Sequence, residues 1–137
     1  MVGYVRATTE RRPARTHAIR PMTLPNADRA RVPPEKLTRY LLNLEHPEGR
    51  TKAAFLRRHG FDESNVDVLE RGLLAVARTG TVQDERWNGH ATTYAVVGDL
   101  LTPRGTTVRL RTVWGVSDLQ EPWFVSAYPE PHRPAPP

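Results

Sequence analysis

The 137-residue sequence contains no cysteine, which excludes disulfide bonds and thiolate metal sites. The lack of cysteine also fits a reducing compartment. No apolar run approaches the length needed to cross a membrane, and the first residues lack the apolar region of an export signal. We therefore expect a soluble, cytoplasmic protein without a membrane partner.

Several motifs of enzymes and metal sites are also missing. The sequence has no glycine-rich phosphate loop, no HExxH zinc motif and no nucleophile elbow. His17, His90 and His132 are scattered without the spacing of metal ligands. We predict neither a metal nor another cofactor.

Positive charge is concentrated at the N-terminus. The formal net charge is +5, and residues 1–20 hold five arginines against one acidic residue, so the other 117 residues carry only +1. The folded part is therefore not a broadly basic nucleic-acid-binding domain, and any polyanion site must be a local patch. Of the 20 basic residues 18 are arginine, which reflects either a coding bias or a functional need.

The apolar pattern predicts helices first and strands afterwards. A stripe at i, i+3, i+4 and i+7 predicts a first helix from residue 34 to 44, with Leu37, Tyr40, Leu41 and Leu44 facing the core. Two more helices are expected, one capped by Thr51 and one capped by Asp62. After Gly80 the period changes to two, and strands are predicted at 81–86, 91–97, 107–116 and 123–128.

This order predicts an α+β fold, in which three N-terminal helices pack on one face of a roughly four-stranded antiparallel meander. Residues 24–129 form its single domain. Residues 1–23 are expected to be a disordered basic arm or linker, and residues 130–137 a Pro-rich tail.

One stretch, residues 40–61, combines an imidazole, a turn and several cations. His46 lies in the predicted turn between two helices, where we expect it to be exposed and mobile. It is either a general acid or base or an ordinary loop histidine. Arg50 and Lys52 begin the next helix, and with its N–H groups they form either a phosphate cradle or a solvated charged face.

The predicted sheet offers further polar groups on its open face. Arg109 and Arg111 share one face of a strand, and they suit either a phosphate or ion pairs with acids of a neighbouring strand. Ser126 and Tyr128 share a face of the last strand, where their hydroxyl groups could donate hydrogen bonds to a phosphate.

Three blocks of the sequence, spread over residues 24–129, resemble an uncharacterised bacterial domain family: YLLNLEHPEGRTKAAFLRRHGF, VRLRTVW and FVSAYP. The matching pattern is LLNxxHPxGRxKA, then RTVW, then a closing Thr/Ser-Ala-Tyr-Pro. The order of helices and strands, and the closing Ser-Ala-Tyr-Pro, are also similar to the barnase, colicin-D and RelE superfamily of ribonuclease toxins.

The resemblance implies a metal-independent endoribonuclease toxin of a toxin–antitoxin or polymorphic toxin system, in which a 2′-hydroxyl attacks the adjacent phosphate. It implies that the partners are RNA, either tRNA or rRNA, and a cognate antitoxin or immunity protein. If the chain is a piece of a larger toxin, it acts after delivery into a target cell's cytoplasm. The catalytic residues would be His46, Lys52, Arg111 and Tyr128. The substrate-binding residues would be Arg50, Arg109, Thr112 and Ser126.

The alternative is a non-catalytic module that binds protein through the open sheet face, as an antitoxin, immunity protein or adaptor. The near-neutral charge of the folded part favours this alternative, because RNA binding gains from net positive charge. The sequence leaves open whether the protein is an enzyme.

Overall fold

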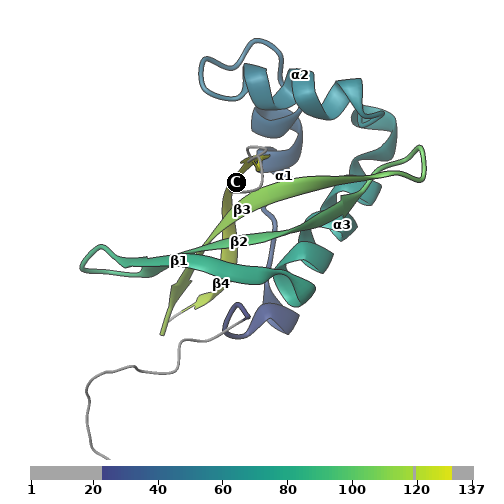
Figure 1. Ribbon diagram of the computed structural model, residues 1–137. Helices are drawn as coiled ribbons and strands as arrows, with labels where there is room; N and C mark the ends of the chain where they lie inside the picture. Colours follow the sequence, from purple (N-terminus) through teal and green to yellow (C-terminus); the bar gives the residue numbers. More distant parts are fainter. Residues whose placement is uncertain (1–22, 119, 131–137) are drawn as a thin grey trace, which may run out of the picture.

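A computed structural model describes residues 23–118 and 120–130 of the chain, and the predicted arm and tail lie almost entirely outside this part. Helical segments come first along the chain, and strands follow (Figure 1). The helical segments are η2 (Ala27–Arg29), α1 (Pro34–Lys36), η3 (Leu37–Leu41), α2 (Arg50–Arg58), η4 (Glu63–Asn65) and α3 (Val66–Thr79). The strands are β1 (Thr81–Trp87), β2 (Thr92–Leu101), β3 (Thr107–Ser117) and β4 (Gln120–Pro129).

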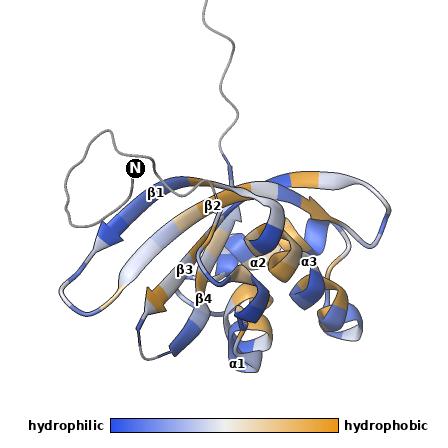
Figure 2. Cartoon of the chain, turned by 90° about the horizontal axis from the view of Figure 1, so that it is seen from below, coloured by the Kyte–Doolittle hydropathy of each residue, from blue (hydrophilic) through white to orange (hydrophobic). Residues whose placement is uncertain are grey.

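The strands form one antiparallel sheet in the order β1-β2-β3-β4, which confirms the predicted α+β class and the four-stranded meander. In Figure 2 the three labelled helices lie beneath the curved sheet, with apolar residues between the two layers. Side chains of β3 alternate as the sequence pattern predicts. Leu110 and Trp114 are buried in the core, while Arg109 and Arg111 belong to the opposite face.

The first helix differs from its prediction. It has one α-helical turn and then continues as a π-helix, in which the Leu42 N–H donates to the Leu37 carbonyl at 3.0 Å. The wider turn rotates the following residues around the axis. Leu42 is therefore fully buried, and Leu44 is 52% exposed, so the predicted core position of Leu44 is wrong.

The caps of the next two helical segments show one correct and one incorrect prediction. Asp62 accepts the Ser64 N–H at 2.8 Å, and the Asn65 side chain accepts the Asp62 N–H in return, so Asp62 is a cap as predicted, although of η4, which leads into α3. Thr51, however, is not the cap of α2. The helix begins at Arg50, and Gly49 precedes it as the N-cap residue, because backbone hydrogen bonds already close the turn before Thr51.

The edge of the sheet at β4 is covered by the start of the described chain. Arg31 donates its N–H to the Pro122 carbonyl at 2.8 Å and accepts the Phe124 N–H at 2.9 Å, which makes a short parallel bridge. Further along β4, side chains of α1 and η3 contact the same edge. None of the helices in the described part of the chain is long and apolar enough to cross a membrane.

Candidate functional site

The loop between η3 and α2 is held by hydrogen bonds to His46. The Nδ1 atom of His46 accepts the backbone N–H groups of Glu48 and Gly49, each at 3.0 Å. The Arg50 N–H donates to the His46 carbonyl at 3.0 Å. The imidazole is half-buried, so the prediction of an exposed His46 is wrong.

These contacts define what His46 can do in this conformation. Two N–H donors point at Nδ1, so we assign the proton of the neutral ring to Nε2. A proton on Nδ1 would break both hydrogen bonds. His46 therefore offers a neutral N–H donor at Nε2, and its lone pair is not free to accept a proton from a substrate.

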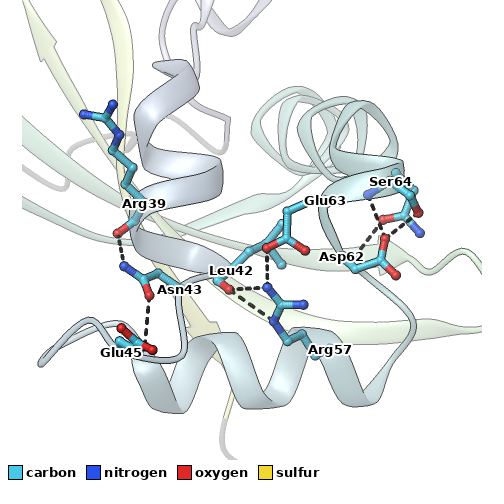
Figure 3. A network of polar contacts seen from close by, with 9 residues as sticks. Arg39, Leu42, Asn43, Glu45, Arg57, Asp62, Glu63 and Ser64 are labelled. Carbon is cyan, nitrogen blue, oxygen red and sulfur yellow. Dashed lines mark hydrogen bonds and ion pairs between the residues drawn. The ribbon is translucent and has the colours of Figure 1, made fainter.

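Arg57 fixes the start of this loop, as Figure 3 shows. Its Nε and Nη2 atoms donate to the Leu42 carbonyl at 3.1 and 2.7 Å, and Nη2 also forms an ion pair with Glu63. The Arg57 side chain is only 29% exposed, and these contacts give it a structural role. It ties the end of η3 to both α2 and η4.

Tyr40 lies at the centre of the candidate site. Its hydroxyl group shares a 2.9 Å hydrogen bond with Oγ of Ser126 on β4. The His46 ring meets the Tyr40 ring edge-on, with 5.0 Å between centroids. The ammonium groups of Lys36 and Lys52 lie 4.9 and 5.5 Å from the Tyr40 centroid. One tyrosine of η3 thus joins the loop, α2 and β4.

Lys52 and Tyr128 are the next pair that the fold brings together. Both border a gap between α2 and β4 that is too small to hold water. The Lys52 ammonium donates to the Glu48 carbonyl at 3.1 Å, which leaves two of its three donors for other partners. Tyr128 is 36% exposed near the end of β4, so part of the residue is accessible to a ligand.

Arg111 extends the site onto the open face of the sheet. It pairs directly with Tyr128 in the β3–β4 register. Its Nη1 atom is 3.9 Å from the Glu130 carboxylate, and both side chains are about one quarter exposed. The pKa of Asp84 on β1 is lowered, first by a hydrogen bond from Arg86 and to a smaller extent by the charge of Arg111. Arg111 is therefore a half-buried cation close to carboxylates.

Arg109 lies two residues before Arg111 and has its own partner. Its Nη1 atom is 3.5 Å from Asp99 on β2, and both side chains are more than half exposed. Of the two interpretations left open for this arginine, ion pairing with a neighbouring strand is the one that the geometry favours.

Two of the predicted substrate-binding residues lie apart from this cluster of contacts. Thr112 is fully buried, and its hydroxyl group donates to the Val96 carbonyl at 2.8 Å and accepts the Trp114 indole N–H at 2.8 Å. Thr112 therefore has a structural role, which corrects its assignment as a substrate-binding residue. Arg50 is exposed at the first residue of α2.

Comparison with known proteins places the chain in a family. A family model described as a domain of unknown function (DUF6883) matches residues 23–131. The chain belongs to this family. Membership confirms the predicted likeness to an uncharacterised domain family, although it does not test the individual sequence blocks. No curated protein matches this DUF6883 domain.

A solved structure shares the fold of the DUF6883 domain. It is a chain of a contact-dependent growth inhibition toxin–immunity protein complex from Klebsiella pneumoniae 342. The two chains are 12% identical with a TM-score of 0.60, and the match covers 78% of this chain and 98% of that chain. At this level of identity the likeness concerns the fold alone.

Three residues of this candidate site were not predicted from the sequence. Tyr40 fitted the core stripe, so nothing in the pattern marked its polar contacts. Lys36 could have been noticed because it is one of only two lysines. Glu130 follows a proline and was assigned to the tail, yet its N–H donates to the Arg109 carbonyl at 3.1 Å and continues the pairing. Within the described residues, no three His, Cys, Asp or Glu side chains form a group that could hold a metal ion.

Proposed function

We propose that this DUF6883 domain is a metal-independent endoribonuclease toxin that acts on RNA in a bacterial cytoplasm. The observation that supports it is the convergence of cations, hydroxyl groups and a carboxylate from η3, the loop after it, α2, β3 and the end of β4. His46, Lys52 and Ser126 surround Tyr40, and Arg111 and Glu130 lie beside Tyr128. The similarity in fold to a chain of a toxin–immunity complex agrees with this proposal.

In this proposal, Lys52 and Arg111 bind the scissile phosphate. The Lys52 ammonium has two donors left after its bond to the Glu48 carbonyl, and the half-buried Arg111 guanidinium can bind two phosphate oxygens. Charge on the phosphate increases in the transition state. Cations fixed beside the developing charge therefore lower the barrier.

Glu130 and Tyr128 are assigned to proton transfer. The Glu130 carboxylate accepts the proton of the 2′-hydroxyl as the 2′-oxygen bonds to phosphorus. The bond from phosphorus to the 5′-oxygen breaks, and the Tyr128 hydroxyl gives its proton to that oxygen. The products are a 2′,3′-cyclic phosphate and a 5′-hydroxyl. His46 contributes its Nε2 hydrogen to a phosphate oxygen, because its Nδ1 lone pair is occupied.

The test is cleavage of labelled tRNA and rRNA fragments by the purified protein in the presence of EDTA. We expect cleavage to continue without divalent metal, to yield cyclic phosphate ends, and to stop when a 2′-deoxynucleotide replaces the nucleotide at the cut. Lys52→Ala and Arg111→Ala should each lower kcat by about 100-fold to 1,000-fold. Glu130→Gln should lower it by about 100-fold to 10,000-fold.

Arg78→Ala is the matched control, because Arg78 is an exposed arginine in the last turn of α3 and its loss changes the net charge by the same amount as the loss of Arg111. Full activity in this variant, together with loss of activity in the site variants, would show that the loss comes from the site residues and not from the change in net charge. Induced expression should arrest growth and fragment cellular RNA, and Arg111→Ala should relieve both effects. Intact RNA and normal growth with the wild-type protein would refute the proposal.

A second candidate is a protein-binding module such as an immunity protein. It is favoured by the ion pairs that already occupy Arg109 and Arg111, and the structurally similar complex contains an immunity protein as well as a toxin. This candidate predicts no growth arrest and protection of cells against a toxin. Charge reversal at Arg109 should then weaken binding of the partner without affecting the fold.

A further inference from the structure

The only two lysines of the chain meet at one aromatic ring. Lys36 and Lys52 are 16 residues apart in sequence, and each ammonium lies within 5.5 Å of the Tyr40 centroid. The other 18 basic residues are all arginine. Both lysine side chains of the protein therefore lie against the same aromatic ring, that of Tyr40.

Lys36 reaches this place from α1 and lies against β4. Its Nζ donates to the Val125 carbonyl at 3.1 Å, and the side chain is half-buried. The next residue, Ser126, shares the hydrogen bond with the Tyr40 hydroxyl. One of the two hydroxyl groups donates in that bond, so the hydrogen of the other remains available to a ligand. Lys36, Tyr40 and Ser126 therefore form a small group of donors.

No ion pair within the described residues balances the charge of these two lysines. Among the ion pairs in residues 23–118 and 120–130, none joins a carboxylate to Lys36 or Lys52. Arg57, Arg109 and Arg111 all have such partners. Both ammonium groups lie near one aromatic ring, so their like charges repel, and a bound anion offsets that repulsion. The pair is thus suited to a ligand with negative charge.

We infer that Lys36, Tyr40 and Ser126 form a second phosphate subsite, which binds the RNA phosphate next to the scissile one. This inference rests on the proposed function, in which Lys52 and Arg111 hold the scissile phosphate. Lys36 lies on the far side of Ser126 from Tyr128, so the RNA backbone follows the edge of β4. Lys36 positions the substrate and takes no part in proton transfer.

The test measures binding of RNA that cannot be cleaved, because it carries a 2′-deoxynucleotide at the cut. Fluorescence anisotropy gives Kd over a range of salt concentrations for the wild type, Lys36→Met and Lys36→Arg. Methionine keeps the apolar stem without the charge. We expect Lys36→Met to reduce the slope of log K against log salt by about 0.7, the value of one single-strand phosphate contact. Lys36→Arg should retain the slope.

A dinucleotide substrate tests the second subsite directly, because it contains the scissile phosphate but no neighbouring phosphate. Lys36→Met should raise KM for a longer RNA several-fold more than it lowers kcat/KM for the dinucleotide. Arg39→Met is the matched control, since Arg39 is exposed in the adjacent π-helical turn and accepts the Asn43 amide through its backbone carbonyl, which the substitution keeps. It should behave like the wild type.

The results of these experiments distinguish failure of the second-subsite inference from failure of the proposed ribonuclease function. If the wild type cleaves RNA and Lys36→Met has the salt slope of Arg39→Met, the second subsite is wrong and the proposed function stands. If Lys36→Met impairs the dinucleotide as much as the longer RNA, the subsite is wrong in the same way. If the wild-type protein neither binds nor cleaves RNA, both proposals are overturned.

Discussion

Leu42 and Leu44 are two leucines in opposite environments. Leu42 is fully buried behind the π-helical turn, and Leu44 is 52% exposed. We expect Leu42→Ala to lower the free energy of unfolding by about 2–5 kcal/mol, because it leaves a cavity in the core. Leu44→Ala should change it by less than about 0.5 kcal/mol. Urea unfolding of the two variants measures both values. The reverse order would mean that the helix follows the regular α-helical stripe.

Asp62 should make stability depend on acid pH. Hydrogen bonds from the Ser64 side chain and backbone lower the pKa of Asp62 below its ordinary value of 3.8. A lowered pKa in the folded state stabilises the protein above the unfolded value, and this contribution is lost as the pH falls through the folded value. Asp62→Asn should therefore flatten the decline of Tm below about pH 4, relative to the wild type. Thermal unfolding across this range provides the measurement, and parallel curves would contradict the role of the cap.

At the scale of elements, the start of α2 depends on Gly49. A methyl group at this position would overlap the Tyr40 carbonyl oxygen, which belongs to the backbone and cannot easily move. We expect Gly49→Ala to destabilise the protein by about 1–3 kcal/mol and to shift the loop away from Tyr40.

Thr51→Ala is the control for this substitution. Thr51 was the predicted N-cap, but the helix already begins at Arg50, so its loss should cost less than about 0.5 kcal/mol. Chemical denaturation and NMR shifts of the loop amides provide the comparison. A larger effect of Thr51→Ala than of Gly49→Ala would restore Thr51 as the cap.

The strands were easier to predict from the sequence than the helices, for a physical reason. Alternation along β3 reports directly which face is buried, since side chains of a strand point to opposite sides in turn. The first helix depended on an assumed period of 3.6 residues, and the π-helical turn changed it. Nothing in the local sequence from Leu37 to Leu41 marks that turn.

At the scale of the whole molecule, the sequence predicted which residues lie close together better than it predicted what each of them contacts. The sequence singled out His46, Lys52, Ser126 and Tyr128. In the fold the first three contact Tyr40, and Tyr128 lies beside Lys52 between α2 and β4. The sequence did not predict that the Nδ1 lone pair of His46 accepts hydrogen bonds from two backbone N–H groups. These bonds depend on the conformation of the loop between η3 and α2. The sequence also assigned Thr112 to a ligand, whereas buried hydrogen bonds occupy its hydroxyl group.

The hydrogen bonds that complete the site join residues far apart in the chain. Tyr40 and Ser126 are 86 positions apart, and Lys36 and Val125 are 89 apart. During synthesis the helical half leaves the ribosome long before β4, so a nascent chain holds only one side of the site. A cut between α3 and β1 likewise separates two incomplete halves. If the proposed activity holds, the host cell is not exposed to it until the last strand has been made and has docked.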